Sequence, residues 1–208
     1  MLVSIILPSR GRPASLMKLY NSLINKAKSE FEVLVGIDDD DEKMKDFSVP
    51  QFMKLYNTKR LNGIASYQNW LWPMAKGDYF FVLNDDVEVI THAWDQIIFD
   101  RMRPLNYGQT SPCGSWGTWY SEFPVIGRAG AKRLGYLMPP HFRSHGADYH
   151  IYKVYNSAGL VVNLRDLILV HNPPEDATHQ YIKKINDDRL IDSSAETNLL
   201  VCPPIKMM

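Results

Sequence analysis

Short apolar runs alternate with helix-like segments over the first hundred residues, and this alternation limits the folds that the chain can adopt. The strand candidates are residues 2–7, 31–37, 52–56 and 79–84. The helix candidates are residues 13–27, 64–75 and 92–103. The runs 2–7 and 31–37 are short and rich in branched side chains, which is typical of strands buried on both faces. Strands that alternate with helices predict βαβ units and a mainly parallel sheet with right-handed crossovers.

After residue 104 the pattern becomes less regular. Residues 107–124 contain Gly108, Gly114 and Gly117 among several aromatic side chains, with little periodicity. The later candidates are a strand at 124–127, helices at 129–135, 147–157 and 175–187, and an apolar stretch at 159–170. We find no internal repeat and no low-complexity segment. The chain is therefore expected to form one α/β domain over 1–208, with a regular half (1–104) and a smaller, loop-rich half (105–208).

Composition narrows the function classes. Lys plus Arg and Asp plus Glu number 23 each, so the formal net charge of zero gives no strong signal for nucleic acid or an anionic membrane. No apolar run approaches the 18 residues of a membrane span, and no targeting segment is recognisable, so a cytoplasmic location is expected. Cys113 and Cys202 are far apart and not in metal-like spacing, which favours two free thiols over a disulfide.

Polar residues come directly after three of the predicted strands. Pro8–Arg12 follow the first strand, Asp38–Asp41 the second, and Asn84–Asp86 the fourth. Because ligands bind beyond the carboxyl ends of parallel strands, these segments are expected to share one rim. Carboxylates with a divalent cation would bind a diphosphate there, since hard oxygen ligands suit Mg²⁺ or Mn²⁺. Each segment alone could be turn or N-cap chemistry, as for Asp40 and Asp41, but their combination favours a binding site.

Three segments resemble family 2 glycosyltransferases of the GT-A fold: residues 3–10, 31–39 and 75–89. The resemblance covers about the first hundred residues well and the remainder loosely. It implies a single Rossmann-like GT-A domain whose first half binds a nucleotide-sugar donor and whose second half binds the acceptor. It also implies transfer of a sugar, with a UDP-type donor favoured, to an acceptor hydroxyl with inversion, and Mn²⁺ or Mg²⁺ as the cofactor.

The resemblance assigns roles to individual residues of the first half. The nucleotide-sugar set is Pro8, Ser9, Arg10, Asp38, Arg60, Asn84 and Asp85. Within it, Asp38 would hydrogen-bond the base and Asp85 would face the ribose or sugar, while Asp86 would coordinate the metal. Asn84 stands where the first Asp of an Asp-x-Asp motif is usual. Its amide oxygen can still accept a hydrogen bond or touch a metal, so this departure weakens metal affinity rather than removing it.

The second half should supply the catalytic base. The resemblance places an acidic residue at the start of a late helix, and Asp148 comes after Gly146 at the start of the 147–157 helix. An inverting transfer needs a carboxylate that accepts the proton of the acceptor hydroxyl. The alternative role for Asp148 is that of a helix N-cap. If Asp148 is not the base, Glu122 and Asp166 are the next carboxylates to consider.

Histidines and tryptophans add further candidates. His171 comes after the apolar run 167–170, where several GT-A enzymes place a metal ligand, although a lone histidine is also commonly structural. His141, His145 or His150 could orient the acceptor or the sugar. Trp116 and Trp119 lie in a Gly-punctuated segment and are candidates for stacking on sugars, with packing under the loop as the alternative.

Two other functions compete with sugar transfer. A sugar nucleotidyltransferase would use a similar sheet and a similar metal site. However, the segment 9–13 is too short and contains too little glycine for the usual phosphate loop of such enzymes. A non-catalytic nucleotide- or sugar-binding domain would keep the fold without turnover. The sequence leaves the acceptor open, whether a glycan or another hydroxyl compound, and the chain can be one module of a longer polypeptide.

Overall fold

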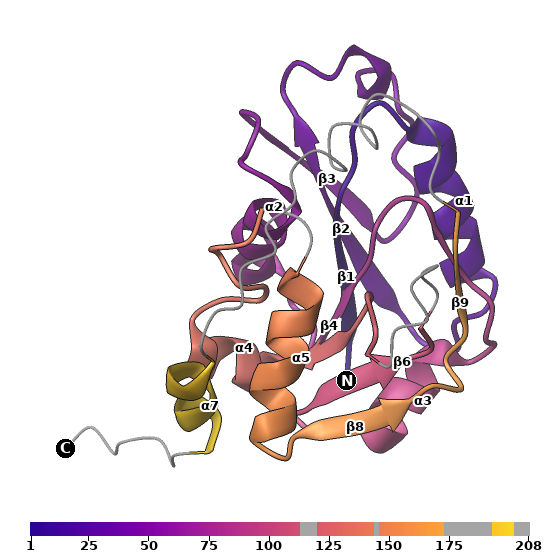
Figure 1. Cartoon of the computed structure of the whole chain (residues 1–208). Helices are drawn as coiled ribbons and strands as arrows, with labels where there is room; N and C mark the ends of the chain where they lie inside the picture. Colours follow the sequence, from indigo (N-terminus) through magenta and orange to yellow (C-terminus); the bar gives the residue numbers. More distant parts are fainter. Residues whose placement is uncertain (113–119, 144–145, 173–192, 202–208) are drawn as a thin grey trace.

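The computed structural model describes residues 1–112, 120–143, 146–172 and 193–201. Its central sheet has seven strands in the order β3-β2-β1-β4-β7-β6-β8, with helices on both faces (Figure 1). The strands are β1 (Val3–Pro8), β2 (Phe31–Asp38), β3 (Met53–Thr58), β4 (Tyr79–Val82), β6 (Tyr107–Thr110), β7 (Val125–Gly127) and β8 (Val161–Leu164).

Four of the six pairings in this sheet are parallel. Strand β1 runs parallel to β2 and β4, β2 to β3, and β6 to β8, whereas β7 is antiparallel to both β4 and β6. The predicted α/β class with a mostly parallel sheet is therefore confirmed. The second half of the chain contributes β6, β7 and β8, so both halves build the same sheet. A separate antiparallel ribbon pairs β5 (Val87–Val89) with β9 (Leu169–His171).

The helices are α1 (Pro13–Ile24), α2 (Ile64–Leu71), α3 (Trp94–Arg101), α4 (Arg128–Leu134), α5 (Ala147–Ser157) and α7 (Ser194–Val201). Helices α1 and α3 cover one face of the sheet, and α2, α4, α5 and α7 cover the other (Figure 1). Successive side chains of β1 point to opposite faces of the sheet. Ile5 therefore packs in the core on the α1 side, and Ile6 packs in the core on the α2 side.

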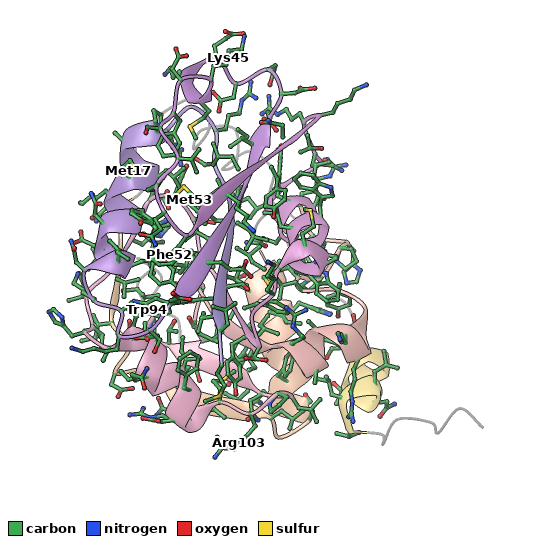
Figure 2. The ribbon with its side chains drawn as sticks, turned by 180° about the vertical axis from the view of Figure 1, so that it is seen from behind. Met17, Lys45, Phe52, Met53, Trp94 and Arg103 are labelled. Carbon is green, nitrogen blue, oxygen red and sulfur yellow. The ribbon has the colours of Figure 1, made fainter. Side chains whose placement is uncertain are left out.

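Aromatic side chains fill the layer under α1 and α3. Trp94 is fully buried and lies edge-on to Phe31 at 5.6 Å between ring centroids. Its indole nitrogen donates to the Leu23 carbonyl at 3.1 Å, so the polar end of the ring is also satisfied. Figure 2, seen from behind, shows Trp94 below Phe52, Met53 and Met17 on this side of the molecule.

The predicted elements differ from the observed ones mainly at their ends. The helix expected at 64–75 is α-helical only to Leu71, and Trp72–Met74 form a 3₁₀ turn around Pro73, because proline cannot donate the next helical hydrogen bond. The sequence did not indicate β5 or β6 as strands. The expected helix at 175–187, Cys113, Cys202, Trp116 and Trp119 lie outside the described residues. Within the described ranges, no helix is both long and apolar enough to cross a membrane.

Candidate active site

A cavity of about 280 Å³ lies beyond the carboxyl ends of β1, β2 and β4. The sequence-predicted residues in its wall are Pro8, Ser9, Arg10, Asp38, Arg60, Asn84, Asp85, Asp86, Asp148 and His171. They come from both halves of the chain, so the fold brings the two halves together at one site.

Asp38 ends β2 and is buried at the base of the cavity. Its Oδ2 accepts from Arg10 Nη1 at 2.5 Å, and its Oδ1 accepts from the Tyr67 hydroxyl. Burial, followed by the hydrogen bond to Asp38, raises the pKa of Tyr67 to about 12, so this hydroxyl keeps its proton and donates. Asp38 is therefore a carboxylate fixed in position by two neighbours in the cavity wall.

Asp40 and Asp41, in the acidic segment after β2, make different contacts. Asp40 is exposed and pairs with Arg10 Nη1 at 2.5 Å, and this contact lowers the pKa of its carboxyl. Asp41 caps the 3₁₀ turn Glu42–Met44 by accepting from the Lys43 amide at 3.2 Å, and it also accepts from the Gly11 amide at 2.6 Å. The N-cap interpretation is thus confirmed for Asp41 but not for Asp40.

Asp85 and Asp86 are adjacent after β4, and both carboxylates lie near the guanidinium group of Arg12. Arg12 Nη1 is 3.2 Å from Asp85 Oδ1 and 3.5 Å from Asp86 Oδ2. The Ser9 hydroxyl donates to Asp85 Oδ2 at 2.7 Å. Burial raises the pKa of Asp85 to about 6, while Ser9 and Arg12 oppose this rise. Two adjacent buried carboxylates are costly, and a positive charge offsets part of that cost.

The β5–β9 ribbon brings His171 to Asp86. Val87 pairs with His171 across the ribbon, and the Asn172 amide donates to the Asp86 carbonyl at 2.9 Å. His171 Nε2 is consequently 3.2 Å from Asp86 Oδ1. Among the described residues, this buried oxygen has no hydrogen-bond partner. The Asp86 carboxylate, the imidazole nitrogen beside it and the Asn84 amide in the same wall form a set that fits Mn²⁺, and the carboxylate and amide oxygens by themselves would also suit Mg²⁺.

Asp148 lies in the first turn of α5 and also lines the cavity. Gly146 is the N-cap residue of this helix, so the N-cap role considered for Asp148 is wrong. Its Oδ1 instead accepts from the Tyr149 amide at 2.9 Å. Burial raises the pKa of Asp148 to about 6, and the charge of nearby Glu122 adds to the rise. A carboxyl group with such a pKa is ionised at neutral pH yet basic enough to accept a proton.

Among the cavity residues to which the sequence gave no individual role are Arg12, Arg143 and Tyr67, although Arg12 was expected at the rim. Arg12 and Arg143 add guanidinium groups to the wall, and Tyr67 adds a phenol. Arg12 had a signal, since it stands in the loop after the first strand, whereas Tyr67 looks like any helix residue. Of the two alternative carboxylates, Glu122 lies in the cavity wall, whereas Asp166 pairs with Arg101 at 2.6 Å and is not part of that wall.

The remaining histidines do not line this cavity in the described structure. His141 and His150 lie elsewhere, against Phe142, and His145 is outside the described residues. The suggestion that one of them orients an acceptor therefore gains no support from their positions.

This fold is the GT-A fold of glycosyltransferases. TarS of S. aureus, in complex with UDP-GlcNAc, matches with a TM-score of 0.64 at 14% identity, over 96% of this chain and 70% of that one. The mannosyltransferase PcManGT from Pyrobaculum calidifontis, in complex with GDP-Man and Mn²⁺, matches with a TM-score of 0.64 at 13% identity, over 86% and 59%. Drosophila β1,4-galactosyltransferase 7, in complex with xylobiose, matches with a TM-score of 0.62 at 14% identity, over 95% and 79%.

The family is established by the sequence match. The model of glycosyl transferase family 2 matches residues 4–126, and the chain belongs to this family. A curated relative, the O-antigen biosynthesis protein RfbC of Myxococcus xanthus, is 30% identical over an alignment of 110 residues that covers 49% of this chain. The chain spans only 8% of the length of that relative.

Proposed function

We propose that the protein transfers a sugar from a nucleotide-sugar, with a UDP-type donor favoured, to an acceptor hydroxyl, with inversion and with the help of a divalent cation. The observation that carries this proposal is the composition of the cavity at the sheet edge. Three groups line it from different elements: a fixed carboxylate at the end of β2, the Asp85–Asp86 pair after β4 with His171 of β9, and Asp148 on α5.

The nucleotide end of the donor would lie against β1 and β2. Asp38 is held by Arg10 and Tyr67. Its side chain would therefore lose little conformational entropy when its carboxylate accepts a hydrogen bond from a base N–H. A uracil offers one such donor beside two carbonyl groups. Two of the compared proteins were seen with UDP-sugars and one with GDP-mannose, which supports a nucleotide-sugar donor in general and a UDP-type donor by majority.

The diphosphate would lie between the arginines and the acidic pair. Arg60 and Arg143 contribute positive charge to the cavity wall, and guanidinium groups suit phosphate oxygens. Asp86 and His171 would hold the cation, with Asn84 as an additional oxygen ligand. When bound, the cation stabilises the negative charge that grows on the departing diphosphate.

Asp148 would act on the acceptor side. Its carboxylate would accept the proton of the acceptor hydroxyl as that oxygen attacks the anomeric carbon from the face opposite the diphosphate. Attack from that face inverts the anomeric centre. The raised pKa of Asp148 suits the task, because a base with an ordinary carboxyl pKa would be weaker.

The first experiment measures binding and turnover of donors. Nucleotide-sugars with different bases and sugars are screened by thermal shift with and without Mn²⁺. A ligand at 100 times its Kd should stabilise the fold by about 2.7 kcal/mol. Hydrolysis of the best donor is then followed with and without Mn²⁺, with Asp100→Asn, an exposed position on α3, as a control variant. Binding without any Mn²⁺-dependent turnover would favour a non-catalytic binding domain, and no binding of any nucleotide-sugar would refute the proposal.

A further inference from the structure

Two histidines and a glutamate converge away from the candidate active site. His141 lies in the segment between α4 and α5, His150 in α5 and Glu196 in the first turn of α7. His150 Nε2 is 3.2 Å from Glu196 Oε1, and His141 Nε2 is 3.9 Å from the same oxygen. One ligand atom from each residue lies within 4.8 Å of the other two. Segments that are remote in sequence thus present three metal-ligating atoms to one point.

The surroundings favour the ligating forms of these groups. The side chain of His150 is 3% exposed and that of Glu196 is 15% exposed. Metals bind the neutral imidazole ring. The Tyr136 hydroxyl donates to Glu196 Oε1 at 3.1 Å, an outer contact that orients the carboxylate. The Phe142 ring lies 5.4 Å from that of His150 and packs beside the cluster.

We propose that His141, His150 and Glu196 form a second metal site, separate from the cavity and specific for Zn²⁺. Two imidazoles and one carboxylate, with water as a fourth ligand, make a tetrahedral set that suits zinc, whereas Mg²⁺ prefers oxygen ligands alone. Ligand atoms about 2.0–2.2 Å from a tetrahedral zinc lie roughly 3.3–3.5 Å apart. The separation of His150 from Glu196 already fits, and the exposed His141 would move inward by about 1 Å.

This zinc would fasten α7 to the helix that carries Asp148. Helix α7 has eight residues, too few to be stable alone. Its described contacts are modest: Leu200 is buried, and its carbonyl accepts from Arg133 of α4 at 2.6 Å. A metal shared by α5 and α7 would add a strong link at the other end of α7. The site does not depend on the proposed sugar transfer.

Zinc titration of the full chain tests this inference. The Asp86→Ala background removes zinc binding at the candidate active site, and a fluorescent zinc indicator reports free Zn²⁺. We expect one equivalent of Zn²⁺ to bind and to raise Tm by about 5–10 °C at 100 times its Kd. Adding His141→Ala should weaken binding by more than about tenfold, because even changes outside the ligand shell cost about 10–100-fold. His141 is exposed, so its loss should leave the far-UV circular dichroism unchanged.

A matched control separates the site from general histidine binding. His92→Ala removes another exposed histidine and should leave the Zn²⁺ affinity unchanged. Glu196→Gln keeps an oxygen that accepts from Tyr136 but lacks the charge, so it should weaken binding as His141→Ala does. The inference is wrong if the Asp86→Ala protein binds no zinc, or if His141→Ala and Glu196→Gln bind it as tightly as the His92→Ala control. A failed donor screen would leave these results unaffected.

Discussion

Asp148→Asn separates catalysis from folding more sharply than any other change in the cavity. The substitution keeps an oxygen that can accept from the Tyr149 amide but removes the ability to take a proton. Transfer should therefore fall by about 10²–10⁴, the usual contribution of a positioned acid or base. The affinities for donor and for Mn²⁺ should stay nearly unchanged, because the proposed role of Asp148 is to act on the acceptor.

The same substitution should stabilise the fold at neutral pH. Burial raises the pKa of Asp148 from an ordinary value near 3.8 to about 6, so ionisation of this group opposes folding. About two pKa units at about 1.36 kcal/mol each give an upper bound of about 3 kcal/mol. Asp148 is partly exposed, so we expect about 1–2 kcal/mol. Because the folded pKa is raised, the gain should be near zero below pH 4, grow through pH 6 and level off above it.

Urea unfolding at several pH values measures this gain, with EDTA present so that no metal affects the carboxylate. Transfer is measured separately with donor and Mn²⁺. Asp100→Asn, at an exposed position on α3, should change neither quantity. Transfer within threefold of wild type, or a variant less stable than wild type at pH 7.5, would refute the assignment of Asp148 as a base with a raised pKa. Glu122, which shares the cavity wall, would then be the next carboxylate to test.

The other predictions concern the donor side. Asp86→Ala should abolish Mn²⁺-dependent donor binding in calorimetry while the circular dichroism spectrum is kept, and unchanged Mn²⁺ dependence would contradict its role as a ligand. Asp38→Ala should weaken donor binding without altering the Mn²⁺ requirement, and an equal loss for all nucleobases would mean that it does not read the base. Gly63→Ala should destabilise the fold and weaken donor binding, because its Cβ would lie 2.0 Å from the Arg143 carbonyl oxygen at a φ of +97°. Gly159→Ala, at a φ of +69° with nothing within 4 Å, should show only the backbone strain of about 1–2 kcal/mol in urea unfolding; equal losses would contradict the steric explanation.

Part of the site was predictable from the sequence because its polar residues directly follow recognisable strands. The runs at 2–7, 31–37 and 79–84 are largely apolar, which indicates central strands. Residues directly after such strands must lie at one rim of a parallel sheet, and Ser9, Asp38 and Asp85 do so. Tyr67 and Arg143 could not be found this way, since nothing in a helix or loop residue indicates which neighbour its side chain contacts.

The sequence by itself determined the layers of this protein, because its most apolar short runs form the inner strands β1, β2 and β4 and helical spacing identifies the covering helices. Tertiary structure decided the pairings. β5 has only three residues, too few for a readable pattern, and its pairing with β9 brings His171 to Asp86. Likewise, only the packing of α7 against α5 brings Glu196 to His150. The local pattern of apolar residues indicates which side chains are buried. Contacts between distant segments depend instead on how all the helices and strands pack together in the core.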